Sequence, residues 1–351
     1  FYFVLDRETG EFISAEPFVF VNWATGYDST GRPIVNPNAV YREAPAVVFP
    51  SMVGAHNWQP MAFNPETGLA YIPAREEGMV ILSEPQYKWK PGATNIGSGA
   101  FMAAIADALP EATRTAFRGI LEANPDLPGI DPQEVLIAYD PVAQQERWRV
   151  PLGTTDWSGG GVLTTGGNLV IQGTSAGFLV AYRADTGEKL AEIEVGTAIM
   201  AAPVTYEMDG EQYVAVVAGL GGAIAAAMHP PRSAPYRYQN YGRILAFKLG
   251  GGKVPLPPAR MPQTTPEPPA APGYSEQLAA RGEAVWSAAG CVFCHGAYGE
   301  TRLSAYPDLY RMSVEIHAAF DSIVLGGKLA STGMAGFSDV LTAQDVAAIH
   351  A

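Results

Sequence analysis

The sequence is short of positive charge, of cysteine and of long apolar segments, and each shortage excludes a class of protein. It holds 22 lysines and arginines against 35 aspartates and glutamates, which gives a formal net charge of −13. Nucleic acid binding needs clustered lysine and arginine that neutralise phosphates, so we expect no nucleic acid partner. The same charge disfavours adhesion to an anionic membrane surface.

The longest apolar run is too short to span a membrane. It covers 16 residues from Tyr213 to Met228 and contains three glycines, whereas a spanning helix needs about 20 apolar residues. We therefore expect a buried strand and loop. The chain opens with a strand-like sequence at Phe1 and stops within an amphipathic pattern at His350, so we expect a piece of a longer polypeptide, with any targeting signal upstream.

Glycine and proline, by contrast, are abundant, with 38 and 29 residues, and charged residues make up only 16%. This composition is typical of short strands joined by many turns. Asp209-Gly210 is a strong signal for a two-residue hairpin. Residues 100–123 are expected to form a helix inserted between strands. The pattern predicts strands at 169–172, 178–182, 190–195, 204–208 and 211–216.

An internal repeat groups these strands. The copies that begin at Ala138 and Ala181 lie 43 residues apart, and a third begins at Val4. Each places a small or apolar residue, a turn and a glycine or polar pair at matching offsets, and the first copy continues to Trp148. A period of this length with about four strands predicts blades of a β-propeller. Unrelated hairpins are the alternative, because Asp-x-x-Thr-Gly is common turn chemistry.

A proline-rich segment without periodicity, residues 250–273, divides the chain. Its composition is typical of a semi-extended linker. It separates a β-rich part, residues 1–249, from a tail, residues 274–351, in which residues 274–288 are expected to form a helix.

Both cysteines of the sequence lie in that tail, in Cys291-Val-Phe-Cys294-His295. In this motif two thiols form thioethers with haem vinyl groups and the adjacent histidine ligates the iron. A redox-active pair or half of a zinc site are the alternatives, but the sequence has no second cysteine pair to complete a zinc site. We therefore predict a small all-α cytochrome c domain with haem c, and a periplasmic location, because covalent haem attachment belongs to that compartment.

The tail also offers a sixth iron ligand. Met334 lies 39 residues after His295, in a glycine-rich loop before a helix predicted to start at Thr342, where Asp345 completes a capping pair. A methionine ligand raises the reduction potential of haem. We expect Met334 as the ligand. Met312, in a helix predicted over residues 309–320, is expected in the core, and His317 as a surface or core residue.

With these features together, the whole chain resembles the C-terminal half of a pyrroloquinoline-quinone (PQQ) quinohaemoprotein alcohol dehydrogenase. That family has an eight-bladed propeller followed by a cytochrome c. The resemblance implies about four blades here, oxidation of alcohols to aldehydes at PQQ, and transfer of single electrons to haem c. It also implies a downstream acceptor such as a cytochrome or cupredoxin. The segments that carry it are residues 1–7, 54–60, 138–148, 157–165 and 199–203.

The resemblance assigns roles by position. Asn57 and Trp58 match an Asn-Trp pair that contacts PQQ, and Leu220 lies in a glycine-rich loop, residues 219–222, that approaches it. An amide hydrogen-bonds quinone or carboxylate oxygens, and an indole N–H donates beside an apolar plane. Packing between blades is the alternative for Trp58. The catalytic aspartate, the calcium ligands, a disulfide and a PQQ-contacting lysine are implied to lie upstream of Phe1.

Two other hypotheses stay open. A degenerate propeller without PQQ could serve as a platform for an electron-carrying cytochrome, although the intact segments at 56–58 and 219–222 disfavour this. The enzyme could also act in a membrane-associated complex. In either setting the rest of the propeller belongs to the same natural chain or to a partner chain, because open sheet flanks make a poor monomer.

Overall fold

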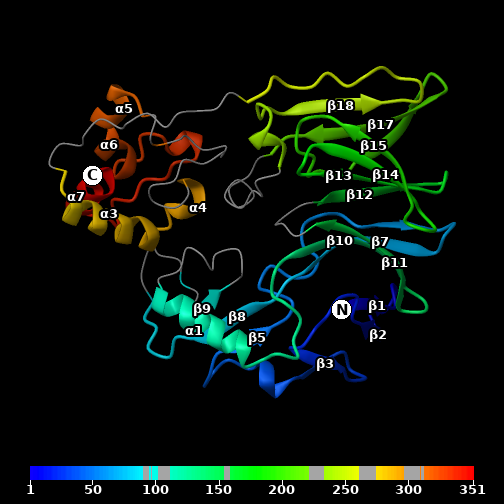
Figure 1. Ribbon diagram of the computed structural model, residues 1–351, viewed down its shortest axis with the longest axis horizontal. Coiled ribbons are helices and arrows are strands. Elements are labelled where there is room, and N and C mark those ends of the chain that lie inside the picture. The colour runs from blue at the N-terminus through cyan, green and yellow to red at the C-terminus, as the bar shows by residue number, and fades with distance from the viewer. Residues whose placement is uncertain are drawn as a thin grey trace. The chain divides into compact units, whose positions relative to one another are not determined.

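The computed structural model describes residues 1–89, 95, 97–101, 111–153, 159–220, 233–260, 274–295, 309 and 312–351. These residues fall into two compact units (Figure 1). Unit 1 lies within residues 1–85, 98–220 and 229–260, and unit 2 within residues 86–97, 221–228 and 261–351. Among the described helices, none combines the length and the apolar character that a membrane span requires.

Two four-stranded antiparallel sheets form the centre of unit 1 (Figure 1). In the second sheet the strands follow one another in chain order, and its last three strands confirm those predicted at 169–172, 178–182 and 190–195. The first sheet consists of β6 (Ala62–Asn64), β7 (Leu69–Glu76), β10 (Gln133–Asp140) and β11 (Gln145–Gly153), and the second of β12 (Gly159–Thr165), β13 (Leu169–Thr174), β14 (Phe178–Arg183) and β15 (Lys189–Glu194).

Smaller sheets complete the unit. The predicted hairpin is confirmed, since Asp209 and Gly210 have φ values of 54° and 77°, as a two-residue turn of this kind requires. It joins β16 (Val204–Met208) to β17 (Glu211–Ala218), which pairs with β18 (Arg243–Phe247). The others are β1 (Tyr2–Leu5) with β2 (Phe12–Glu16), β3 (Ala24–Tyr27) with β4 (Pro33–Val35), and β5 (Ala46–Val48) with β8 (Met79–Ser83) and β9 (Ser98–Phe101); η1 (Pro37–Ala39) and η3 (Ala234–Tyr236) are 3₁₀ turns.

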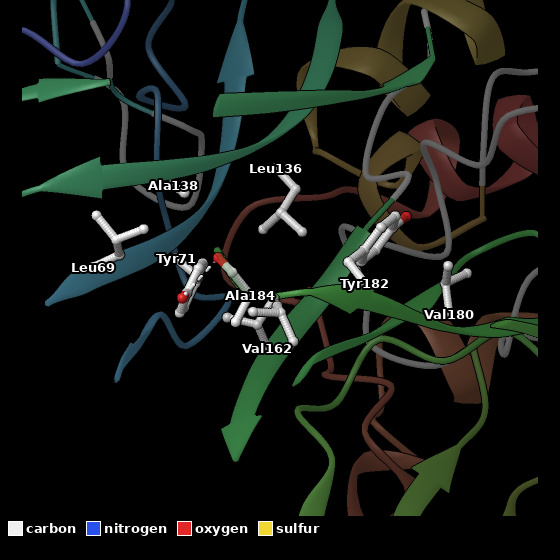
Figure 2. Packing of buried hydrophobic residues seen from close by; sticks show 9 residues of the cluster. Leu69, Tyr71, Leu136, Ala138, Val162, Val180, Tyr182 and Ala184 are labelled. Atoms are coloured by element: carbon white, nitrogen blue, oxygen red, sulfur yellow. Dashed lines mark hydrogen bonds between the residues drawn. The ribbon is translucent and has the colours of Figure 1, made fainter. Parts of the chain in front are cut away.

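The two central strands of the first four-stranded sheet, β7 and β10, are buried on both faces. Successive side chains of a strand point to opposite sides, and β7 is buried from Leu69 to Arg75. Tyr71 and Leu136 face the second sheet, where they pack with Val162 and Val180 (Figure 2). The alternate residues of the same strands pack into a second cluster on the other face. This double burial explains why these strands read as continuous apolar runs.

The repeated turn gives the two sheets their contact. The indole Nε1 of Trp148 and the hydroxyl of Tyr71 both donate to the carbonyl of Ala184, each at 3.0 Å. Gly187, with φ of 76°, lies under the Trp148 ring, and a Cβ there would come within 2.7 Å of that ring. The turn of one repeat is therefore the docking surface for the tryptophan of the preceding repeat.

The predicted helix at 100–123 is partly wrong. Ala100 and Phe101 belong to β9, because they pair with β8, and residues 102–110 lie outside the described part. Helix α1 covers Glu111–Glu122. Its Phe117 is buried against Phe49 and Val80, so the insertion covers the small sheet of β5, β8 and β9.

Unit 2 is helical in its described part. The helix predicted at 274–288 is confirmed, with Ser275 as N-cap, and so is the last helix, where Thr342 and Asp345 form the predicted capping box. Those hydrogen bonds, with help from Arg281, lower the pKa of Asp345 to about 2. The helices are α3 (Glu276–Ala288), α4 (Val292–His295), α5 (Val314–Ala318), α6 (Phe320–Val324) and α7 (Ala343–His350), with η5 (Ala330–Thr332) as a 3₁₀ turn.

The helix predicted over 309–320 is wrong in extent. The Ser313 side chain caps a helix that starts at Val314. This helix, α5, ends at Ala318, and Ala319 separates it from α6. Met312 therefore precedes the helix, although it packs on the core of the unit as expected.

Helices α3 and α7 cross closely at Gly282, where a Cβ would lie only 2.0 Å from the carbonyl oxygen of Ala348. Arg281 and Asp345 join the same two helices through an ion pair of 2.7 Å. The buried core of the unit consists of Trp286, Phe320, Val324, Val346 and Ile349.

The first part of the predicted linker lies on unit 1. The amide of Gln239 donates to the carbonyl of Pro258, and the amide of Arg260 donates to the carbonyl of Arg237. Residues 261–273 lie outside the described part, so the boundaries at 249 and 274 stay predictions.

Candidate functional site

Cys291, Cys294 and His295 lie on a single helical turn. The amides of Cys294 and His295 both donate to the carbonyl of Cys291, at 3.2 and 2.9 Å. Residues three and four apart share one face of a helix, so one turn presents both thiols and the imidazole together. The amide of Cys291 donates in turn to the carbonyl of Trp286, which fixes the motif to the end of α3.

The surroundings of this turn are apolar. Cys291 packs on the core cluster of unit 2, and the ring of Trp286 lies 5.8 Å from that of His295. Burial raises the pKa of the Cys291 thiol to about 11. Redox-active cysteines have lowered thiol pKa values, so this environment disfavours a disulfide-exchange pair.

No group of three or more histidine, cysteine, aspartate or glutamate side chains in the described ranges is arranged to hold a metal ion. Two thiols and one imidazole beside an apolar cluster are instead the donor set that fits a covalently attached porphyrin.

Met334 lies in a loop held against the same cluster. Its amide donates to the carbonyl of Leu329 at 3.2 Å, and it follows Gly333, which has φ of 101°. Its side chain packs on the core cluster of unit 2, as do those of Cys291 and Met312. The structure thus brings two thioethers to the apolar cluster of the motif, and the choice of Met334 as ligand stays a prediction.

The imidazole of His317 contacts His350. Its Nδ1 lies 2.8 Å from Nε2 of His350, whose ring stacks on Phe320 with centroids 4.2 Å apart. Its half-buried position agrees with the expectation of a surface or core residue.

In unit 1 the candidate residues Asn57 and Trp58 lie in the loop between β5 and β6. The side-chain amide of Asn57 donates to the carbonyl of Val53 at 2.8 Å, and His56 donates from Nδ1 to the carbonyl of Pro73 at 2.9 Å. Trp58 keeps 46% of its surface exposed. The side chains of Asn57 and His56 therefore hold the loop to backbone carbonyls, while the indole of Trp58 is accessible to a ligand.

The backbone beside this loop comes from distant segments. The amide of Val162 donates to the carbonyl of Pro60 at 3.0 Å. A Cβ on Gly161 would come within 2.6 Å of Pro60 and 2.8 Å of Ala202. Glycine at 161 thus lets β12 meet the segments that precede β6 and β16, and all three belong to segments named from the sequence.

Leu220 is held at the same end of the sheets. Its backbone N–H donates to the Asn240 amide oxygen at 3.3 Å, and the Asn240 NH₂ donates to the Leu220 carbonyl at 3.0 Å. The amide of Gly219 donates to the carbonyl of Ala198, next to the segment that Gly160 approaches. Gly221 and Gly222 lie outside the described residues. The structure therefore connects Asn57, Trp58 and Leu220 through a continuous set of backbone contacts.

Sequence reasoning missed a group of buried charged side chains next to the loop between β5 and β6. The group is formed by Arg75, Glu77 and Glu134. The available signal was the charged run Arg75-Glu76-Glu77, which begins within the last two residues of the apolar strand β7.

Comparison with known proteins gives one family. The family model for the PQQ glucose/ethanol/alcohol dehydrogenase β-propeller domain matches residues 27–214, which confirms the predicted propeller fold. A quinohemoprotein alcohol dehydrogenase of Comamonas testosteroni is 38% identical over 100% of this chain and 46% of its own length. Quinohemoprotein alcohol dehydrogenase ADH IIB of Pseudomonas putida is 40% identical over 99% of the chain and 46% of its own length.

A solved structure agrees. Quinohemoprotein alcohol dehydrogenase ADHIIG of Pseudomonas putida HK5 superimposes with a TM-score of 0.78 at 37% identity, over 99% of this chain and 48% of that one. The chain thus spans about half the length of the relatives it matches.

Proposed function

Since the chain belongs to the family of PQQ-dependent quinohaemoprotein alcohol dehydrogenases, we propose that its full-length protein oxidises alcohols to aldehydes at PQQ. The electrons pass one at a time to a covalently bound haem c. The observation that carries this proposal is the single helical turn with Cys291, Cys294 and His295 beside an apolar cluster, in a chain whose other unit matches the PQQ propeller.

In this proposal residues 274–351 are a cytochrome c domain. Haem supplies one-electron redox chemistry when it is bound. Cys291 and Cys294 hold it through thioethers, and His295 and Met334 ligate the iron. The buried side chains around Trp286 support this assignment, because they keep water from the group and raise its reduction potential together with the methionine ligand.

Residues 1–249 form the C-terminal part of the propeller, with about four blades, and residues 250–273 link the two domains. PQQ supplies the two-electron oxidation of the alcohol when it is bound. Asn57 hydrogen-bonds a quinone or carboxylate oxygen, Trp58 donates its indole N–H, and Leu220 gives an apolar contact. The exposed indole of Trp58 supports a flat ligand here. The catalytic aspartate and the calcium ligands lie upstream of Phe1.

The cellular location is inferred from the covalent attachment of haem. We place the protein in the periplasm, with a cytochrome or cupredoxin as the downstream electron acceptor. The upstream half of the propeller comes from the same natural chain or from a partner chain.

The test is a spectrum of the purified full-length protein with calcium. Ethanol or 1-butanol alone is expected to reduce the haem and give sharp α and β bands, as dithionite does. If only dithionite reduces the haem and acid extraction yields no PQQ, the protein is an electron carrier on a propeller platform.

A further inference from the structure

Three ionisable side chains are buried together at the end of β7. Arg75, Glu77 and Glu134 expose only 4%, 1% and 4% of their surfaces. A guanidinium nitrogen of Arg75 lies 3.1 Å from Glu77 Oε1, and its Nε lies 3.9 Å from Glu134 Oε1. Arg75 and Glu134 are direct partners in the register of β7 and β10, so the sheet itself brings opposite charges together.

Such a cluster is a costly way to stabilise a fold. Desolvation of buried charges offsets most of their attraction, and apolar residues of similar volume are often as stabilising. A buried charged group does specify geometry, because each of its hydrogen bonds has a direction and an unpaired charge is strongly disfavoured.

What this cluster specifies is the loop that follows β5. Ser51 donates from its hydroxyl to Glu77 Oε2 at 2.7 Å and from its amide to the Glu77 carbonyl at 2.8 Å. The amide of Arg75 donates to the carbonyl of Ala55 at 2.8 Å. The loop is thus attached to the same two charged residues at its start and immediately before His56, and the next residues are Asn57 and Trp58.

We propose that Ser51, Arg75, Glu77 and Glu134 form a buried brace that holds Asn57 and Trp58 in the conformation that binds PQQ. They are positioning residues, since none of them is placed at the cofactor itself. The inference rests on the proposed function of this loop. A preformed loop lowers the ordering cost of binding, so the brace acts on the affinity for PQQ.

The test uses full-length protein produced without PQQ and titrated with PQQ in the presence of calcium. Ser51→Ala removes the hydroxyl from Glu77 and keeps the Arg75–Glu77 pair, so the protein is expected to fold. Loss of a hydrogen bond to a charged group is expected to raise the Kd for PQQ about tenfold. Ser51→Thr, which restores a hydroxyl, is expected to recover most of the affinity. Glu77→Gln is expected to exceed the effect of Ser51→Ala.

Tyr71→Phe is the matched control, because it removes one buried hydroxyl from the opposite end of β7. It is expected to lower the melting temperature and to leave the Kd for PQQ within twofold of the wild type. If Ser51→Ala binds PQQ as tightly as the wild type, the brace is wrong and the proposed function stands. If the wild type itself binds no PQQ, the proposed function fails first. If Glu77→Gln does not fold, the comparison of Ser51→Ala with Ser51→Thr decides.

Discussion

The two units hold their candidate sites in different ways. In unit 2 the thiols and the imidazole come from five consecutive residues, and one helical turn is enough to bring them together. In unit 1 Asn57, Trp58 and Leu220 come from segments more than a hundred residues apart, joined only through the packing of several sheets. A local motif needs little of the fold around it, whereas an assembled site needs nearly all of it.

The hydrophobic cores of the two units also differ in size. One cluster of five buried side chains forms the core in the described part of unit 2, while unit 1 has several separate clusters on both faces of its sheets. Small domains bury a smaller fraction of their surface and often need a cofactor for stability. We therefore expect unit 2 to depend on the proposed haem for its stability, and unit 1 to be stable without it.

The largest expected effect comes from removing the haem attachment. Cys291→Ser with Cys294→Ser is expected to abolish covalent haem entirely and to unfold much of unit 2, because the cofactor is missing from a small core. Haem absorbance after acid–acetone extraction and a PQQ titration measure the two consequences separately. PQQ binding is expected to persist. Loss of PQQ binding in this variant would show that the two sites are not independent.

The next largest effect is expected from a glycine-to-alanine substitution, which we compare at two helical positions. Gly282→Ala places a Cβ 2.0 Å from the Ala348 carbonyl, and such overpacking is expected to lower the free energy of unfolding of unit 2 by about 3 kcal/mol. Gly119→Ala, at an exposed position of helix α1 with no described atom within 4 Å of the new Cβ, is expected to raise the stability of unit 1 by about 0.5 kcal/mol. Denaturant unfolding measures both, and equal signs would contradict the close crossing of α3 and α7.

These contrasts also explain what the sequence could predict. The haem motif, the Asp209-Gly210 turn and the Thr342–Asp345 capping box depend on neighbours within a few residues, and each was predicted. The pairing of Arg75 with Glu134 depends on the register of β7 and β10, with α1 inserted between them in the chain, and no local pattern encodes it. Phe101 is a strand residue only because β8 lies beside it, and that partner overrides a helical pattern.

A smaller effect is expected at the contact between the two large sheets. Trp148→Phe removes the hydrogen bond to the Ala184 carbonyl and part of the contact with Gly187. It is expected to lower the free energy of unfolding of unit 1 by about 2 kcal/mol. Tyr213→Phe is the control, since its hydroxyl donates to the exposed Glu211, and its effect is expected within about 0.5 kcal/mol. Similar effects of the two variants would argue against the docking role of the repeated turn.

The smallest effect is a pH dependence confined to unit 2. Burial, and then the charge of His317, lower the pKa of His350 from its ordinary value of 6.5, although Asp321 opposes this. The unfolded chain therefore binds a proton there more readily than the folded unit, so stability is full above pH 6.5 and falls as the pH drops below it. Melting of unit 2 between pH 5 and 8 measures this. His317→Gln is expected to weaken the dependence, and an unchanged slope would remove the histidine contact as its source.

The most direct test of a PQQ site in unit 1 and a haem site in unit 2 is the cofactor content of the purified full-length protein. Acid–acetone extraction separates free haem from covalent haem, and the acid extract is assayed for PQQ by chromatography. We expect one equivalent of haem that stays with the polypeptide and one equivalent of PQQ that is released. Haem that extracts into the solvent, or protein that carries covalent haem and never PQQ when both are supplied, would contradict this expectation.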